Sequence, residues 1–285
     1  MKITLASHYG FCQGVKNAIK IAENAVLNNK KPIYMLNKIV HNQAVVDHLS
    51  SLGIITLDDS RSLEEKILSL NEGTIIFSAH GHDKKLEELA KKRGLSVVDT
   101  TCPKVINNVL SMLKAKDNQQ KVVYIGVKKH PETIASLSID KEIIFLDFFA
   151  PDYSKLNKDD EVSIHNQTTL IQKDLDKIYQ EIAKRVKSIS IRNDICYATT
   201  LRQKALEEVT DEEVIFIVGD KISSNSTRLF EVCKRLYPTK DVFQISTISD
   251  LDNIDLKKYK KGFLTAGAST PESIINPILN KLSSD

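Results

Sequence analysis

The chain alternates between two patterns of apolar residues. Short apolar runs, among them residues 33–36, 121–126 and 214–219, are typical of β-strands that are buried on both faces. Between them lie longer segments with apolar residues three or four positions apart, such as residues 105–113, which are typical of amphipathic helices. Strands that alternate with helices predict an α/β fold built from parallel sheets with right-handed crossovers.

The pattern repeats three times along the chain. Cys12, Cys102 and Cys196 each follow a strand-like run and precede a helical one. Their spacing is nearly equal and is close to one third of the 285-residue chain. After each of the three helices come further apolar strands, and each of these strands is followed in the sequence by a polar turn. The repeat therefore predicts three similar α/β units.

The two ends of the chain together complete the last repeat. The third repeat ends on a predicted helix at residues 271–282 and lacks the strand that precedes each cysteine, whereas the chain begins with such a strand at residues 3–6. We therefore expect the N-terminal strand to join the third sheet. The predicted units are residues 13–101, residues 102–193, and residues 194–285 completed by the N-terminal strand within residues 1–12. We expect these three pseudo-symmetric units, each a small parallel sheet flanked by helices, to form a trefoil around a central cavity.

The composition narrows the class of protein. Hydrophobic residues make up 41% and charged residues 27% of the chain, and the formal net charge is +3. Such a small charge gives no reason to expect nucleic acid as a partner, and no run of about 18 apolar residues predicts a membrane span. The N-terminus shows no signal-peptide pattern. Four cysteines without close pairs suggest a reducing, cytoplasmic setting, in which thiols bind metals, act in catalysis or are simply buried.

Polar residues gather where the predicted strands end. Ligands of open parallel sheets lie beyond the carboxyl ends of the strands. If the three units face one another, the polar residues at these ends converge on one cavity. They are Cys12, His41, His80, Cys102, His130, Glu132, Thr168, Thr169, Cys196, Ser223, Asn225 and Ser269.

The three repeated cysteines suit a metal centre. A thiol at the start of a helix lies near the positive end of the helix dipole, which favours the thiolate. Three thiolates without a Cys-x-x-Cys pair suit an iron–sulfur cluster with one open iron better than a structural zinc site. The alternative is that each cysteine is a small buried residue. The fourth, Cys233, falls on a helical apolar pattern and is expected to serve packing.

The histidines, serines and asparagine at the strand ends suit an anion. Helix N-termini present unpaired amide groups, and imidazole, hydroxyl and amide side chains add donors. Without a Walker-type glycine loop, the set favours a compact phosphate or diphosphate over a nucleotide. Glu132 would deliver a proton if burial raised its pKa. The alternatives are ordinary hydrogen-bonded histidines and a surface glutamate that caps the helix after Pro131.

Nine short blocks carry a family resemblance. Together, and in order from residue 3 to about residue 282, they resemble the 4-hydroxy-3-methylbut-2-enyl diphosphate reductases, which perform the last step of the methylerythritol phosphate route to isoprenoids. The blocks are Gly10–Val15, Val40–Asn42, Phe77–Gly81, Asp99–Pro103, His130–Glu132, Gln167–Leu170, Asp194–Thr200, Ser223–Ser226 and Thr265–Ser269.

The resemblance implies a reaction and a role for each candidate residue. The reaction would be reductive loss of the substrate's hydroxyl, with two electrons and two protons consumed, giving isopentenyl and dimethylallyl diphosphate. Reduced ferredoxin or flavodoxin would be the electron donor. Cys12, Cys102 and Cys196 would bind a [4Fe–4S] cluster, Glu132 would supply protons, and Thr168 would lie beside the hydroxyl in the proton relay. The diphosphate would be held by His41, His80, His130, Ser223, Ser224, Asn225 and Ser269.

Two other functions stay open on the residues alone. A non-catalytic iron–sulfur electron carrier or redox sensor would keep the cysteines but would not need His41, Ser223 and Ser269. A zinc- or phosphate-binding hydrolase would keep the anion site, although three widely spaced thiolates would be an unusual zinc set.

Overall fold

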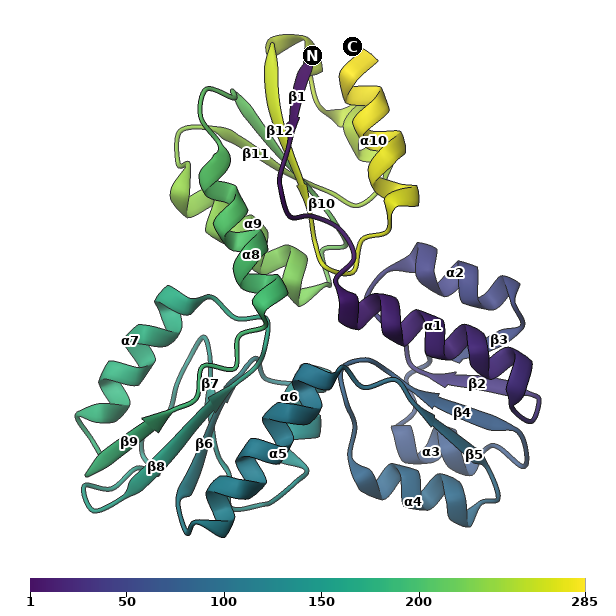
Figure 1. Ribbon diagram of the computed structural model, residues 1–285, viewed down its shortest axis with the longest axis vertical. Coiled ribbons are helices and arrows are strands. Elements are labelled where there is room, and N and C mark those ends of the chain that lie inside the picture. Colours follow the sequence, from purple (N-terminus) through teal and green to yellow (C-terminus); the bar gives the residue numbers. More distant parts are fainter. Residues whose placement is uncertain (285) are drawn as a thin grey trace. The chain divides into compact units, whose positions relative to one another are not determined.

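A computed structural model describes residues 1–284. The polypeptide forms strands and helices in alternation over most of its length (Figure 1). The strands are β1 (Lys2–Leu5), β2 (Ile33–Leu36), β3 (Ile54–Leu57), β4 (Thr74–Phe77), β5 (Ser96–Asp99), β6 (Lys121–Gly126), β7 (Ile144–Asp147), β8 (Glu161–Asn166), β9 (Ser188–Ile191), β10 (Val214–Val218), β11 (Asp241–Ile245) and β12 (Lys261–Ala266). The helices are α1 (Gln13–Asn28), α2 (Gln43–Ser51), α3 (Leu63–Leu68), α4 (Lys84–Lys92), α5 (Pro103–Asp117), α6 (Pro131–Leu137), α7 (Gln172–Ala183), α8 (Tyr197–Ala205), α9 (Ser224–Leu236) and α10 (Glu272–Ser284).

The strands form three four-stranded sheets, and all pairs between neighbouring strands are parallel. The orders are β3-β2-β4-β5, β7-β6-β8-β9 and β11-β10-β12-β1. The three orders are equivalent, because β5, β9 and β1 each occupy the same edge and each precede one of the repeated cysteines. This confirms the predicted fold class of three pseudo-symmetric parallel α/β units. The trefoil arrangement around a cavity stays a prediction.

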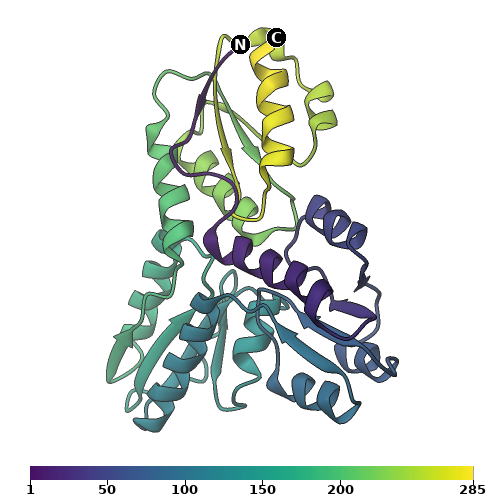
Figure 2. The ribbon, with the colours of Figure 1, turned by 45° about the vertical axis from the view of Figure 1, so that its right-hand side comes forward.

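The N-terminal strand occupies the edge that the third repeat left open. β1 pairs with β12 from Lys2 opposite Lys261 to Leu5 opposite Leu264. The N-terminal ammonium group also donates a hydrogen bond to the carbonyl oxygen of Leu282 at 3.0 Å, and Figure 2 shows both chain ends beside α10. The first residues therefore close the third sheet.

The central strand β10 is apolar at every position because helices cover both faces of its sheet. In β10, Ile215 and Ile217 pack into one cluster with residues of α8 and α9. Val214, Phe216 and Val218 point the other way and pack with residues of α10. The period of two along a strand divides a continuous apolar run between two cores, so the continuous run predicted the architecture correctly.

By its contacts the chain divides into two compact units. One comprises Met1–Lys16, Val40–His48 and Cys196–Asp285, and the other comprises Asn17–Ile39 and Leu49–Ile195. The boundaries predicted for three repeats stay a prediction, and residue 285, the last of the third repeat, lies outside the described residues. No helix within residues 1–284 is long and apolar enough to cross a membrane.

Candidate active site

The three repeated cysteines lie at strand-to-helix turns, as predicted. Cys102 is the N-cap of α5 and Cys196 is the N-cap of α8, while Cys12 directly precedes α1. Within residues 1–284 none of the three forms a disulfide, and all three are half-buried. Each sulfur therefore belongs to a residue at the positive end of a helix and is accessible to a ligand.

In the unit that contains the third sheet, Asn225 links the turn around Cys12 to α8. The amide of Cys12 donates to the carbonyl oxygen of Ala268 at 3.1 Å. The amide of Ala268 in turn donates to Oδ1 of Asn225 at 3.5 Å, and Nδ2 of Asn225 donates to Oγ1 of Thr199 at 3.2 Å. Asn225, at the start of α9, thus contacts Ala268, whose carbonyl oxygen binds the amide of Cys12. It also contacts Thr199 in α8, the helix that begins after Cys196.

The same unit brings two of the predicted serines together. The hydroxyl oxygens of Ser223 and Ser269 lie 3.0 Å apart, and both residues are buried. Ser223 is the N-cap of α9, and Ser224 is its first residue. A Cβ atom at Gly267 would lie 2.1 Å from Oγ of Ser226, so only glycine lets the N-terminus of α9 approach the end of β12 this closely.

Arg202 is a residue of this unit that sequence reasoning missed. Its guanidinium group donates to the carbonyl oxygen of Ala198 at 2.7 Å and to that of Gly10. Its side chain is almost completely buried, and burial lowers the pKa of the guanidinium, while the thiolates of Cys12 and Cys196 act in the opposite direction. Arg202 therefore supplies a buried positive charge close to Cys12 and Cys196. In the sequence, only its position six residues after Cys196 could have indicated that Arg202 belongs to the site.

His41 lies in this unit as well. It is half-buried and directly precedes Asn42, whose side-chain oxygen accepts a hydrogen bond from the amide of Val45 at 3.3 Å. His41 is therefore placed at the N-terminal end of α2.

The other unit contains the remaining candidates, and it brings Cys102 close to His80. The amide of Cys102 donates to the carbonyl oxygen of Ala79 at 3.0 Å. The rings of His80 and His130 meet edge to face with centroids 5.7 Å apart. Between Ala79 and α6, Gly81 adopts a positive φ of 86°, and a Cβ there would lie 3.3 Å from that of Ala135.

His130 and Glu132 begin α6. Nδ1 of His130 accepts a hydrogen bond from the amide of Glu132 at 3.2 Å, which makes His130 the N-cap. The capping role that the sequence allowed for Glu132 belongs instead to His130. The Glu132 side chain points into the protein, and the residue is 2% exposed, so the surface-glutamate alternative is wrong.

Thr168 holds the carboxyl group of Glu132 with two hydrogen bonds. The amide of Thr168 donates to Oε1 at 2.8 Å and its hydroxyl donates to Oε2 at 2.9 Å. Burial raises the pKa of Glu132 to about 7, against the lowering effect of these two bonds. The negative charge of Asp194 adds to the rise. A carboxyl group with this pKa is balanced between its acid and base forms at neutral pH.

A buried chain of polar side chains behind Glu132 was also missed from the sequence. Oγ of Ser163 lies 3.0 Å from Nε2 of His165, and Nδ1 of His165 lies 3.1 Å from Oδ2 of Asp194. All three are buried. They fix the Asp194 carboxylate, two residues before Cys196. In the sequence His165 belongs to the polar segment that follows residues 162–164, and nothing there indicated that it is buried.

Parallel sheets, thiols at helix N-termini and a buried carboxyl group of raised pKa define a class of α/β proteins equipped for anion binding and redox chemistry. The chain belongs to the LytB protein family, whose model matches residues 3–283. This confirms the resemblance drawn from the nine blocks.

Similar proteins cover nearly the whole chain. A 4-hydroxy-3-methylbut-2-enyl diphosphate reductase from Anoxybacillus flavithermus is 34% identical over 286 residues, covering 99% of this chain and 90% of that protein. One from Geobacillus thermodenitrificans is 36% identical over 288 residues with the same coverage. The solved structure of the corresponding reductase from Plasmodium falciparum aligns with a TM-score of 0.86 at 32% identity, over 99% of this chain and 88% of that one.

A second solved structure adds the metabolic setting. It is the (E)-4-hydroxy-3-methyl-but-2-enyl diphosphate reductase described as the terminal enzyme of the non-mevalonate pathway, and it aligns with a TM-score of 0.72 at 31% identity over 100% of this chain and 99% of that one. These relatives support an iron–sulfur oxidoreductase of isoprenoid biosynthesis, acting on a diphosphate, rather than an electron carrier or sensor.

The thiols of this chain fit an iron–sulfur group. Cys12, Cys102 and Cys196 are half-buried at helix N-termini, and Arg202 offers two of them a buried positive charge. Cys233, by contrast, is completely buried in an apolar cluster, and burial raises the pKa of its thiol to about 12. Cys233 therefore serves packing, and three thiols are suited to bind iron.

Proposed function

We propose that this chain removes the hydroxyl group of 4-hydroxy-3-methylbut-2-enyl diphosphate reductively and forms isopentenyl and dimethylallyl diphosphate. The carbon–oxygen bond breaks and a carbon–hydrogen bond forms. Two electrons and two protons enter, one proton leaving with the hydroxyl as water and the other joining carbon.

The buried Glu132–Thr168 pair carries the proposal. A pKa of about 7 lets Glu132 give up a proton at neutral pH and take another from solvent. Thr168, whose hydroxyl is 2.9 Å from the carboxylate, would orient the carboxyl group and contact the departing hydroxyl. An electron carrier would have no use for a buried carboxyl group of this kind.

The family resemblance implies the residues that would hold the diphosphate. They are His41, His80, His130, Ser223, Ser224, Asn225 and Ser269. Ser223 is the N-cap of α9 and His130 is the N-cap of α6. Amide groups at a helix N-terminus together with hydroxyl and imidazole donors are suited to phosphate oxygens.

Cys12, Cys102 and Cys196 would hold a [4Fe–4S] cluster. When bound, a cluster with one open iron would supply electrons singly and a Lewis-acid site for the substrate's hydroxyl. Reduced ferredoxin or flavodoxin as the donor, and a cytoplasmic location, stay predictions from the sequence and the family resemblance.

The test is turnover by protein purified and reconstituted without oxygen. With a chemical reductant, it should convert the hydroxymethylbutenyl diphosphate into both products, detected by NMR. Cluster-loaded protein that accepts electrons but forms neither product would contradict the proposal and favour an electron carrier. Colourless protein with stoichiometric zinc would favour a hydrolase.

A further inference from the structure

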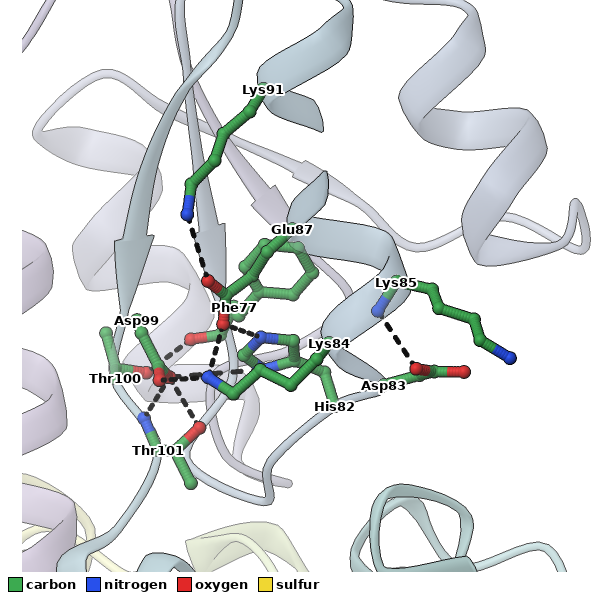
Figure 3. A network of polar contacts seen from close by, with 10 residues as sticks. All are labelled: Phe77, His82, Asp83, Lys84, Lys85, Glu87, Lys91, Asp99, Thr100 and Thr101. Carbon is green, nitrogen blue, oxygen red and sulfur yellow. Dashed lines mark hydrogen bonds and ion pairs between the residues drawn. The ribbon is translucent and has the colours of Figure 1, made fainter. Parts of the chain in front are cut away.

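A second group of metal-binding side chains lies outside the proposed active site. His82 follows β4, Glu87 lies in the first turn of α4, and Asp99 ends β5. One possible ligand atom from each lies within 4.8 Å of the others, and Figure 3 shows the three side chains converging. The proposed reaction uses none of the three.

The His82 ring is fixed in place on two sides. It stacks on Phe77 with centroids 3.8 Å apart and ring planes 17° apart. Nε2 lies 2.8 Å from Oε1 of Glu87. Two acceptors would repel each other at this distance, so Nε2 carries the hydrogen and donates it to Glu87. The other ring nitrogen, Nδ1, then presents its lone pair.

That lone pair is buried and lacks a hydrogen-bond partner. The side chain of His82 is 4% exposed, and Nδ1 makes no hydrogen bond among the described residues. It faces Oδ1 of Asp99 at 3.9 Å, and this oxygen already accepts hydrogen bonds from the amide of Thr101, at 2.8 Å, and from the Thr101 hydroxyl. Two electron-rich atoms therefore face each other with no donor between them.

A divalent cation would satisfy both atoms. Two ligands at about 2.1 Å from one ion can lie up to about 4.2 Å apart, so the 3.9 Å separation of Nδ1 and Oδ1 admits an ion with little movement. The Glu87 carboxylate accepts a hydrogen bond from Nε2, the ring nitrogen that would not bind the ion. Metal-binding histidines commonly have such a carboxylate partner. Glu87 is ionised for this role, because hydrogen bonds from Lys84 and His82 outweigh burial and lower its pKa to about 2.

Lys84 supplies a competing positive charge. Its ammonium group lies 2.5 Å from Oε1 of Glu87 and 3.9 Å from Oδ2 of Asp99. Because the side chain of Lys84 is 75% exposed, it can turn away into solvent when an ion arrives.

The site also has a route for an ion and its waters. A cavity of about 490 Å³ is lined by His82, Lys84 and Asp99 together with residues of α5 such as Val105 and Leu110. Water in this cavity can fill the coordination positions that the protein leaves open.

We propose that Nδ1 of His82 and the carboxylate of Asp99 bind a divalent transition-metal ion, with Glu87 orienting the imidazole. One imidazole with carboxylate and water ligands suits Mn²⁺, Fe²⁺ or Zn²⁺. The ion would join the loop after β4 to the turn at Asp99–Thr101, which directly precedes Cys102. The proposal does not depend on the reductase reaction.

The test is titration of the cluster-containing protein with Mn²⁺, without oxygen, followed by loss of the EPR signal of the free ion. Mn²⁺ prefers nitrogen and oxygen to thiolates, so the titration reports this site whether or not the cysteines hold iron. One Mn²⁺ per chain is expected. His82→Gln should weaken binding about tenfold or more, and His48→Gln, at an exposed histidine of α2, should leave it unchanged.

Lys84→Met supplies an independent readout. Removing the competing ammonium should tighten Mn²⁺ binding several-fold, and this exposed position tests the site even if His82→Gln does not fold. No binding by the unaltered protein, equal binding by a folded His82→Gln variant, or unchanged or weaker binding by Lys84→Met would overturn the proposal.

Discussion

Glu132 accepts both an amide and a hydroxyl hydrogen bond from Thr168, at 2.8 and 2.9 Å, inside the protein. These bonds stabilise the carboxylate, while burial stabilises the neutral acid. Burial prevails and the pKa of Glu132 rises to about 7. The proton of Glu132 is therefore exchangeable at neutral pH, which a solvent-exposed glutamate would not achieve.

Glu132→Gln should bind substrate and iron but lose turnover about 100-fold or more, because a carboxamide is not an acid at neutral pH and cannot transfer a proton. The measurements are substrate affinity, iron content and steady-state rate with a chemical reductant. Turnover near that of the unaltered protein would reject Glu132 as the proton source.

Glu132 should also make stability depend on pH. The folded protein holds this proton more tightly than the unfolded chain does, so the stability from protonation is complete below about pH 4.5 and is lost as pH rises through about 7. The loss is about 3 kcal/mol. Urea unfolding from pH 4.5 to 8 should show that Glu132→Gln declines less than the unaltered protein. Parallel curves would contradict the raised pKa.

Thr168→Val should shift the pH dependence of turnover. It removes the hydrogen bond from the hydroxyl to Oε2 of Glu132. Because this bond lowers the pKa of Glu132, its loss should raise that pKa, and the pH at which activity falls should move upward. Thr168→Ser keeps the hydroxyl and is the matched control. The pH profile of kcat/KM measures the shift, and equal profiles for the valine and serine variants would argue against the role given to this hydrogen bond.

Replacing the cysteines should divide them into two groups. Cys12→Ser, Cys102→Ser and Cys196→Ser should each lose most of the iron, because each thiol is accessible at a helix N-terminus. Cys233→Ala should keep the iron and lose about 1 kcal/mol of stability from a small cavity in the apolar cluster. Iron content and urea unfolding test this, and full iron content in any of the first three variants would remove that cysteine from the proposed ligands.

Arg202→Met should lower the free energy of unfolding by about 1–3 kcal/mol, because the carbonyl oxygens of Ala198 and Gly10 lose a charged hydrogen-bond donor inside the protein. Lys204→Met, at an exposed position of the same helix, is the matched control and should change stability little. Urea unfolding measures both variants. Equal stability of the Arg202 variant and the unaltered protein would argue against the role given to these hydrogen bonds.

The sequence by itself determined the three parallel sheets, the strand-to-helix turns that carry the three cysteines, and the family. Apolar residues recur every two residues in strands and every three to four in helices, and this spacing shows which face of each element is buried. Because the pattern repeats three times, the sequence gives this information for each of the three sheets. Even the joining of β1 to the third sheet followed from a missing strand in the last repeat.

Only the tertiary structure decided which polar groups are buried and what they meet. Arg202 donates to Gly10 across 192 residues of sequence, and His165 meets Asp194 across 29. Glu132 has its raised pKa because α6 turns it away from water, and the buried Nδ1 of His82 faces Asp99 because β4 and β5 pair. The burial of single polar side chains and their non-local partners set the charge states of these groups. Apolar periodicity reports which faces are buried, but not which polar side chains lie inside or what they contact.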